Sequence, residues 1–377
     1  MLIYLPIIFL FILAIAIIFA NPFFRFRKFL KAENEVECEQ WPDITILLTT
    51  HKNALQLENN IENYLHQDYP GNYELVVVAE KGDSETEDVL KRHAANEKLY
   101  YTFIPESSRY MSRKKLAVTL GIKAAHYDWI VMSEPECAPT SESWLKEFAK
   151  GCTADSKLVM GYCKFDEETP SYYRFSRLQT SLYLMRKALK KTAFRTDCPL
   201  LAFNKSTFID GDGYRGYLQF IGGEYDFLVN KYAERGNTSV RFVPQAWLTE
   251  SEPRLTKWRN QHLYYMDARR YLKRRHSVKA LFNFDNTLLH IFTIATIATI
   301  AFSIIVQEWI VLGASVCLWA VATILRYVLA KPVMQYFEEP FGLMTFHFYD
   351  LTTIYHNAMN MLRYWRADKY DFTTHKQ

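Results

Sequence analysis

Two carboxylates one residue apart, Glu134 and Glu136, follow a strand-like apolar run and carry the plainest chemistry in the chain. The stretch from 130 to 139 reads IVMSEPECAP. Alternate side chains of an extended segment point the same way, so both carboxylates can face one cleft. Carboxylate oxygens are the ligands that Mg²⁺ and Mn²⁺ prefer, and such an ion can carry a diphosphate. The spacing therefore predicts a divalent-metal site at Glu134 and Glu136, and the alternative is an acidic pair that binds no metal.

Alternating strand-like and helical segments precede these carboxylates. Strands are predicted at 44–50, 73–80, 99–105 and 128–134, and helices at 53–66, 84–95 and 112–126. Strands that alternate with helices predict an α/β fold with a mostly parallel sheet and right-handed crossovers. Ligands of such sheets bind beyond the carboxyl ends of the strands. His51, Glu80, Glu134 and Glu136 all lie at strand ends of that kind.

Two of the helices carry local signals. Ser84, with Glu87 three residues later, is typical of an N-cap and its capping box. Leu55, Ile61 and Leu65 form the apolar stripe expected of the helix at 53–66.

Three apolar runs, at 2–20, 287–306 and 309–329, are long enough to cross a bilayer, and the first of them is uncharged. The first has no basic residues before it and no A-x-A site after it, which favours an anchor over a cleaved signal. The expected organisation is an N-terminal span (1–21), a linker (22–42), the α/β domain (43–255), a basic amphipathic helix at the membrane (256–282), two spans (283–330) and an interfacial or cytoplasmic segment (331–377).

Basic residues predict the orientation of these spans. Arg25, Arg27, Lys28 and Lys31 follow the first span, and a basic run from 269 to 279 precedes the second. Positive-inside reasoning places the middle of the chain in the cytoplasm. The net charge of +4 is modest and its basic part flanks the membrane. It therefore favours lipid headgroups over nucleic acid as a partner.

The six cysteines show no C-x-x-C spacing, which favours free thiols over a zinc or redox site.

Five segments resemble, in order, the motifs of family 2 glycosyltransferases, particularly bacterial membrane-anchored members. The segments are PDITILLTTHKN, YELVVVAEKGDSETEDVL, SRKKLAVTLGIKAAHYDWIVMSEPECAP, LLAFNKSTFIDGDGY and GGEYDFLVNKYAERG. The resemblance implies the Rossmann-like GT-A fold over roughly 43–265. It also implies a nucleotide-diphosphate sugar, with UDP as the expected nucleotide, and Mg²⁺ or Mn²⁺ at Glu134 and Glu136.

The resemblance assigns further roles, each with an alternative. Donor contacts are expected at Thr50, His51, Glu80, Lys114 and Lys115. A capping or turn role remains open for the first two, and a solvated helix face for the two lysines.

The resemblance also places the catalytic base in a loop with Glu224 and Asp226. That base deprotonates an acceptor hydroxyl in a single inverting displacement. Tyr225 stands at the family's usual base position, so Asp226 or Glu224 must serve. Asp210 and Asp212, flanked by glycines, are expected to be turn residues.

Gln261 alone survives from the Gln-x-x-Arg-Trp motif of the polymerising members, which argues against a processive synthase. Trp258, Gln261 and Tyr265 lie at helical spacing, either on a membrane-surface helix or in contact with an acceptor.

Together with the apolar runs and basic flanks, the resemblance implies a membrane-anchored hexosyltransferase of the bacterial inner membrane, with its catalytic domain in the cytoplasm. It would transfer a sugar to a lipid-linked or membrane-presented acceptor in surface polysaccharide or glycolipid synthesis. The alternative is a catalytically degenerate subunit or scaffold of a polysaccharide-assembly complex.

Overall fold

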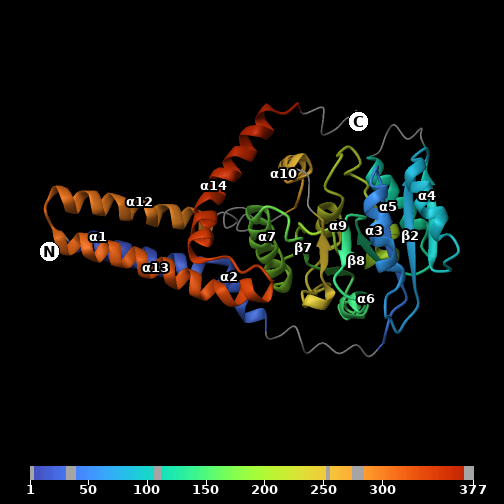
Figure 1. The fold of residues 1–377 in the computed structure, drawn as a ribbon, viewed down its shortest axis with the longest axis horizontal. Coiled ribbons are helices and arrows are strands. Elements are labelled where there is room, and N and C mark those ends of the chain that lie inside the picture. The colour runs from blue at the N-terminus through green and yellow to red at the C-terminus, as the bar shows by residue number, and fades with distance from the viewer. Residues whose placement is uncertain (1–3, 31–39, 106–111, 252–254, 274–283, 369–377) are drawn as a thin grey trace. The chain divides into compact units, whose positions relative to one another are not determined.

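A computed structural model describes residues 4–30, 40–105, 112–251, 255–273 and 284–368 of this 377-residue chain. The chain divides into two compact units. One consists of residues 1–32 and 274–359, and the other of residues 33–273 and 360–377. Figure 1 shows that the first unit is helical and that the second contains the sheet.

The larger unit is built on a seven-stranded sheet in the order β3-β2-β1-β4-β8-β6-β9. The first four of these strands run parallel, β8 runs antiparallel to both of its neighbours, and β6 pairs in parallel with β9. The mostly parallel sheet predicted from the sequence is therefore confirmed. The strands are β1 (Ile44–Thr49), β2 (Tyr73–Glu80), β3 (Leu99–Ile104), β4 (Trp129–Ser133), β6 (Leu158–Met160), β8 (Leu201–Asn204) and β9 (Thr238–Val240).

A second, three-stranded sheet has the order β5-β10-β7. Its strands are β5 (Cys137–Pro139), β10 (Leu248–Glu250) and β7 (Cys163–Phe165). Strand β5 begins directly after the Glu134–Glu136 segment. Strand β10 pairs antiparallel with β5 and parallel with β7, so this sheet brings together three stretches that are far apart in the sequence.

Helices accompany these strands: α3 and α5 lie beside β2, and α4 lies beside α3 (Figure 1). The helices of this unit are α3 (Ala54–Leu65), α4 (Ser84–His93), α5 (Arg113–Ala124), α6 (Trp144–Ala149), α7 (Ser171–Leu189), α8 (Lys205–Asp210), α9 (Glu224–Tyr232) and α10 (Leu255–Ala268). A 3₁₀ turn covers Pro244–Ala246.

Gly121 lets α5 approach the sheet closely. A Cβ at this position would lie 2.3 Å from Leu47 Cδ1 on β1 and 3.0 Å from Val78 Cγ2 on β2. Contacts that short are repulsive, so a larger residue would push α5 away from the sheet. This packing fixes the distance between α5 and the sheet, and it therefore helps to position the first turn of α5, which carries Lys114 and Lys115.

Three local expectations differ from the structure. Asp83, not Ser84, is the N-cap of α4, because its carboxylate accepts the backbone N–H of Thr86. Leu55 is 69% exposed, and Leu57 instead lies on the buried stripe of α3. The segment 22–29, expected within a linker, forms α2 (Pro22–Phe26) and a 3₁₀ turn (Arg27–Phe29).

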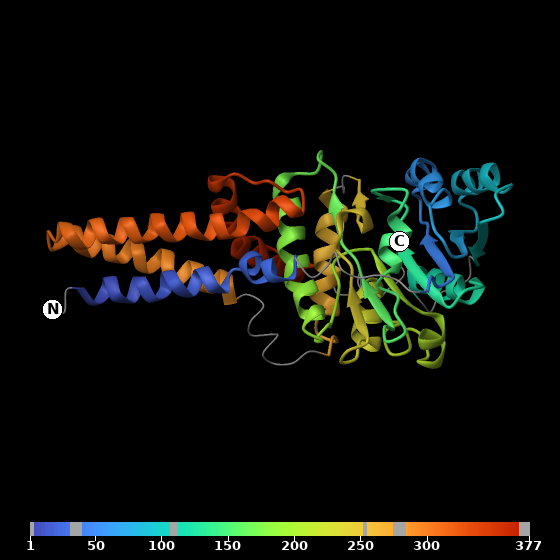
Figure 2. The ribbon, with the colours of Figure 1, turned by 90° about the horizontal axis from the view of Figure 1, so that it is seen from below.

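The smaller unit contains the long apolar helices α1 (Leu5–Ala20), α12 (Phe284–Ile305) and α13 (Trp309–Tyr336), which pack against one another (Figure 2). Helices α12 and α13 are each long and apolar enough to span a membrane. Helix α1 together with 22–29 forms a pair bent by 48° that would make a third span. Helix α14 (Leu343–Arg366) follows and is not among the candidate spans of the described residues.

A buried arginine ties these helices together. Arg326 of α13 donates to both carboxylate oxygens of Asp285 on α12, at 2.9 and 2.6 Å, and to Asp350 on α14 at 2.7 Å. It also donates to the carbonyl of Ile17 on α1. A buried guanidinium is tolerated only when its donors are paired, and here three other helices, α1, α12 and α14, supply the partners.

Candidate functional site

The end of β2 brings together the first group of predicted site residues. Glu80 Oε2 lies 3.0 Å from His51 Nδ1, and Glu80 Oε1 lies 2.7 Å from Arg113 Nε. Thr50 lies beside them in sequence, is buried, and its backbone N–H donates to the Val78 carbonyl at 2.9 Å. Its hydroxyl oxygen has no hydrogen-bond partner among the described residues. A buried hydroxyl left open at a strand end is available to a ligand.

A second group lies at the end of β4, where three elements converge on one carboxylate. Glu134 Oε1 accepts from Lys114 Nζ of α5 at 2.5 Å and from the Tyr225 hydroxyl of α9 at 2.8 Å. The same Lys114 ammonium lies 2.9 Å from Glu224 Oε1. Lys114 therefore bridges the predicted metal pair and the predicted base loop.

Burial and charge act against each other in this cluster. Burial raises the pKa of Glu134, and Lys114 offsets only part of that effect. For Glu224, burial is outweighed by Lys114 and Lys115, which lower its pKa. The pKa of Lys114 is raised, because the two carboxylates outweigh the burial of its ammonium. Glu224 Oε2 is buried and has no hydrogen-bond partner within the described ranges.

Glu136 is held by a different cation. Lys257 Nζ of α10 lies 3.2 Å from Glu136 Oε1 and 3.5 Å from Glu250 Oε1. Burial would raise the pKa of Glu136, but Lys257 outweighs it and the pKa is lowered. Glu250 is in turn paired with the buried Arg177 at 2.9 Å. Lys257 and Arg177 both come from helices that the sequence offered no reason to place here.

Asp226 occupies the first turn of α9 but faces away from this cluster toward another arginine. Its Oδ1 lies 3.4 Å from Arg195 Nε, and the Arg195 guanidinium stacks 3.7 Å over the Tyr265 ring. Burial raises the pKa of Asp226 to about 6, although Arg195 opposes the shift. The helix begins after Gly223, whose φ of +81° is left-handed, a conformation that suits glycine.

The neighbouring lysine, Lys115, is fully buried and donates to the carbonyls of Phe220 and Gly222. The solvated-face interpretation is therefore wrong for Lys115. It also has no direct route to a phosphate, because its ammonium fastens the loop that precedes α9. Burial lowers the pKa of Lys115 to about 8.

Helix α10 carries the remaining candidates. Trp258 is buried and stacks on Tyr173, with their ring centroids 4.1 Å apart. His262 covers another side of the same indole at 4.1 Å. Trp258 thus belongs to the core of this unit and not to a membrane-facing side. Gln261 is exposed, and the predicted basic continuation at 274–283 lies outside the described residues.

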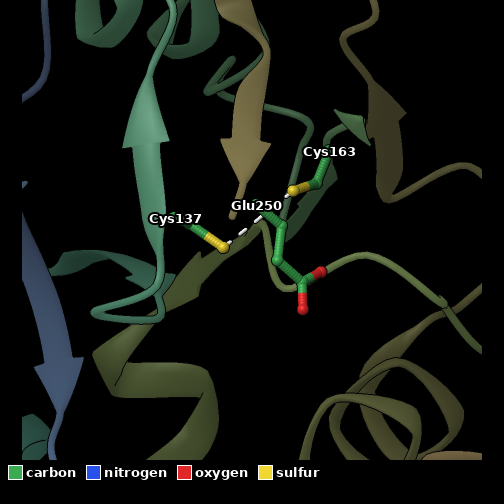
Figure 3. A group of neighbouring side chains, drawn as sticks. All are labelled: Cys137, Cys163 and Glu250. Atoms are coloured by element: carbon green, nitrogen blue, oxygen red, sulfur yellow. Dashed lines mark hydrogen bonds between the residues drawn. The ribbon is translucent and has the colours of Figure 1, made fainter. Parts of the chain in front are cut away.

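Cys137, Cys163 and Glu250 form a group that the sequence analysis missed (Figure 3). Their ligand atoms lie within 4.8 Å of one another, with the two sulfurs 3.9 Å apart. Strand β10 brings them together from three distant stretches of sequence. The Glu250 carboxylate already faces Arg177 and Lys257, and burial raises the pKa of the Cys137 thiol.

These contacts favour a packed structural cluster over a metal centre, since metal ligation needs thiolates. The free-thiol prediction is confirmed for the described cysteines, Cys137, Cys152, Cys163, Cys198 and Cys317.

The carboxylates at the strand ends offer the donor atoms that a divalent cation prefers. Glu134 and Glu136 offer hard oxygen ligands, and the orphaned Glu224 Oε2 lies on the same Lys114-centred cluster. Lysines occupy Oε1 of both candidate ligands, so a cation there would have to displace them.

The fold is that of an α/β protein with a cluster of acids and lysines at the carboxyl ends of its strands, the edge at which sheets of this kind bind ligands. No protein-family model and no curated protein matches the chain. Among solved structures, the fold is similar to that of a mannosyltransferase from Pyrobaculum calidifontis in complex with GDP-Man and Mn²⁺. The TM-score is 0.53 at 17% identity, over 95% of this chain and 100% of the other. The chain therefore has the fold of a glycosyltransferase.

Proposed function

We propose that this protein is a membrane-anchored glycosyltransferase that takes a sugar from a nucleotide-diphosphate donor. The observation that carries the proposal is the convergence of Lys114, Glu134 and Glu224 of α9 at the carboxyl end of β4. In a sheet of this topology that end is the ligand-binding edge. The similarity to a mannosyltransferase fold supports the same assignment.

The donor would lie along the strand ends. Thr50, His51 and Glu80 are the proposed contacts of the nucleoside, and the open Thr50 hydroxyl is the best placed of the three. Lys114 is the proposed phosphate contact. We keep UDP as the proposed nucleotide. The GDP-Man of the structural neighbour makes GDP the alternative to test beside it.

Mg²⁺ or Mn²⁺ would be held by Glu134 and Glu136. When bound, the cation would neutralise the diphosphate as it leaves the sugar.

Transfer would proceed by one inverting displacement. The acceptor oxygen forms a bond to the anomeric carbon while the bond from that carbon to the diphosphate oxygen breaks. The hydroxyl proton passes to a carboxylate of the α9 turn. Asp226 is the stronger base, because burial raises its pKa to about 6 while Lys114 and Lys115 lower that of Glu224. The ion pair with Arg195 must loosen for Asp226 to reach an acceptor.

The acceptor is proposed to be a lipid-linked or membrane-presented hydroxyl compound. Helices α12 and α13 could hold the chain in a membrane, and the basic residues that flank the apolar runs favour a cytoplasmic site. Gln261 is the proposed acceptor-side contact on α10. We place the protein in a bacterial inner membrane, in surface polysaccharide or glycolipid synthesis.

Calorimetry on the full chain in detergent tests the proposal. We expect UDP, or GDP, to bind with Mn²⁺ present, whereas a nucleoside monophosphate should bind more weakly. Failure of both diphosphates to bind would refute the donor site. Binding without transfer to any membrane extract, from either class of nucleotide sugar, would instead favour a catalytically degenerate scaffold with the same fold.

A further inference from the structure

The ammonium group of Lys114 lies where a divalent metal ion bound by Glu134 would be expected. Its ammonium lies 2.5 Å from Glu134 and 2.9 Å from Glu224, between a proposed metal ligand and the base loop. Both acids are largely buried, with side-chain exposures of 12% and 11%. The lysine therefore supplies the only nearby positive charge that the described residues place on both of these carboxylates.

Lys114 can also leave this position more easily than its neighbour could. Its side chain is 35% exposed, whereas Lys115 is fully buried and fixed to two backbone carbonyls. Lys115 and the close approach at Gly121 hold α5 in place, so Lys114 can swing without moving the helix. A long, flexible side chain with an exposed part suits an exchange of partners.

We propose that Lys114 is an exchangeable counter-ion. It holds Glu134 and Glu224 when no donor is bound and turns to the donor diphosphate when a divalent cation takes its place. This inference rests on the proposed function, and it adds an order of events that the proposed function does not require.

The physical reason is charge balance. Lys114 with Glu134 and Glu224 carries a formal charge of about −1, and a divalent cation added to that group would turn the sum positive beside an ammonium. A nucleoside diphosphate brings the negative charge that accommodates both cations. Cation and nucleotide should therefore bind cooperatively, and each should strengthen the other by the same factor.

The test measures free Mn²⁺ by electron paramagnetic resonance during titration of the full chain in detergent, with and without UDP and with and without GDP. For the wild type we expect weak Mn²⁺ binding alone and at least about tenfold tighter binding with the matching nucleotide. Lys114→Met should bind Mn²⁺ alone about tenfold more tightly than the wild type. In that variant, the nucleotide should add little.

Lys123→Met is the matched control, because it removes the same charge from an exposed position on the same helix. Lys114→Gln replaces the methionine variant if that variant does not fold, and Lys114→Arg should keep the weak binding of the wild type. Unchanged or weaker Mn²⁺ binding in Lys114→Met overturns the exchange, as does an equal gain in Lys123→Met or a lack of Mn²⁺ binding in every variant. Absence of nucleotide binding to the wild type refutes the proposed function instead, and the nucleotide-free titrations still decide the lysine's role.

Discussion

The pH dependence of transfer separates the two candidate bases, because their surroundings shift their pKa values in opposite directions. Burial raises the pKa of Asp226 from 3.8 to about 6, whereas Lys114 and Lys115 lower that of Glu224 from 4.5. A base must be ionised to accept a proton. If Asp226 serves, the rate should be nearly level above about pH 7, about half-maximal at pH 6, and about tenfold lower at pH 5 than at pH 7. If Glu224 serves, the same interval should change the rate by less than about 1.5-fold.

The assay follows release of nucleoside diphosphate from a nucleotide sugar, using the full chain in detergent with a membrane-lipid acceptor extract. Asp226→Asn should lower transfer by about 10²- to 10⁴-fold and leave donor affinity nearly unchanged. Asp212→Asn is the control, since Asp212 is an exposed turn residue whose carboxylate lies 3.1 Å from Arg215 Nη1. A level profile from pH 7 to pH 5, together with an active Asp226→Asn variant, would refute the assignment of Asp226.

Two further predictions concern the same site. Glu136→Gln should remove the Mn²⁺ dependence of UDP binding and leave the fold intact. Calorimetry with Mn²⁺ or EDTA measures the binding, and circular dichroism checks the fold. Equal UDP binding by the wild type in Mn²⁺ and in EDTA would contradict the metal site itself. Gly223→Ala should lower the free energy of unfolding by about 1–2 kcal/mol and slow transfer. The φ of Gly223 is +81°, and the added Cβ would lie 2.9 Å from Phe227 in the turn that carries Glu224 and Asp226. A thermal midpoint and a transfer rate equal to those of the wild type would show that this turn tolerates the change.

Continuous apolar runs made much of the sheet predictable. The strand expected at 73–80 is β2, the one expected at 44–50 is one residue longer than β1, and the one expected at 128–134 is one residue longer than β4 at each end. Each is a buried β-branched run bounded by polar residues, so sequence-local signals suffice. Helix ends were less certain, because Asp83 and Ser84 are both good N-caps and the choice depends on how the chain leaves β2.

The partners of the site residues were not predictable in the same way. Glu134 and Glu136 were found from their spacing, but Lys257 and Tyr225 reach them from α10 and α9. Which basic side chain pairs with which carboxylate depends on the packing of helices that are far apart in the sequence, and no local sequence pattern predicts that packing. The same holds for Cys137, which meets its partners only because β10 pairs with both β5 and β7.

The glutamate at position 134 has a reach that an aspartate would lack, and this leads to a last prediction. Its Oε1 contacts both Lys114 and Tyr225, at 2.5 and 2.8 Å. An aspartate would withdraw the carboxylate by about 1.5 Å, one bond length, and would lengthen both contacts while keeping the charge.

If charge for a cation is the main requirement, Glu134→Asp should weaken Mn²⁺-dependent UDP binding by less than about tenfold and Glu134→Gln by more. If the reach to Lys114 and Tyr225 matters more, the glutamine variant should bind better than the aspartate variant, because it keeps the length and shape of the side chain. Calorimetry of the two variants and the wild type measures which variant binds UDP more tightly in the presence of Mn²⁺. Tighter binding by Glu134→Gln would mean that Glu134 organises α5 and α9 and does not hold a cation.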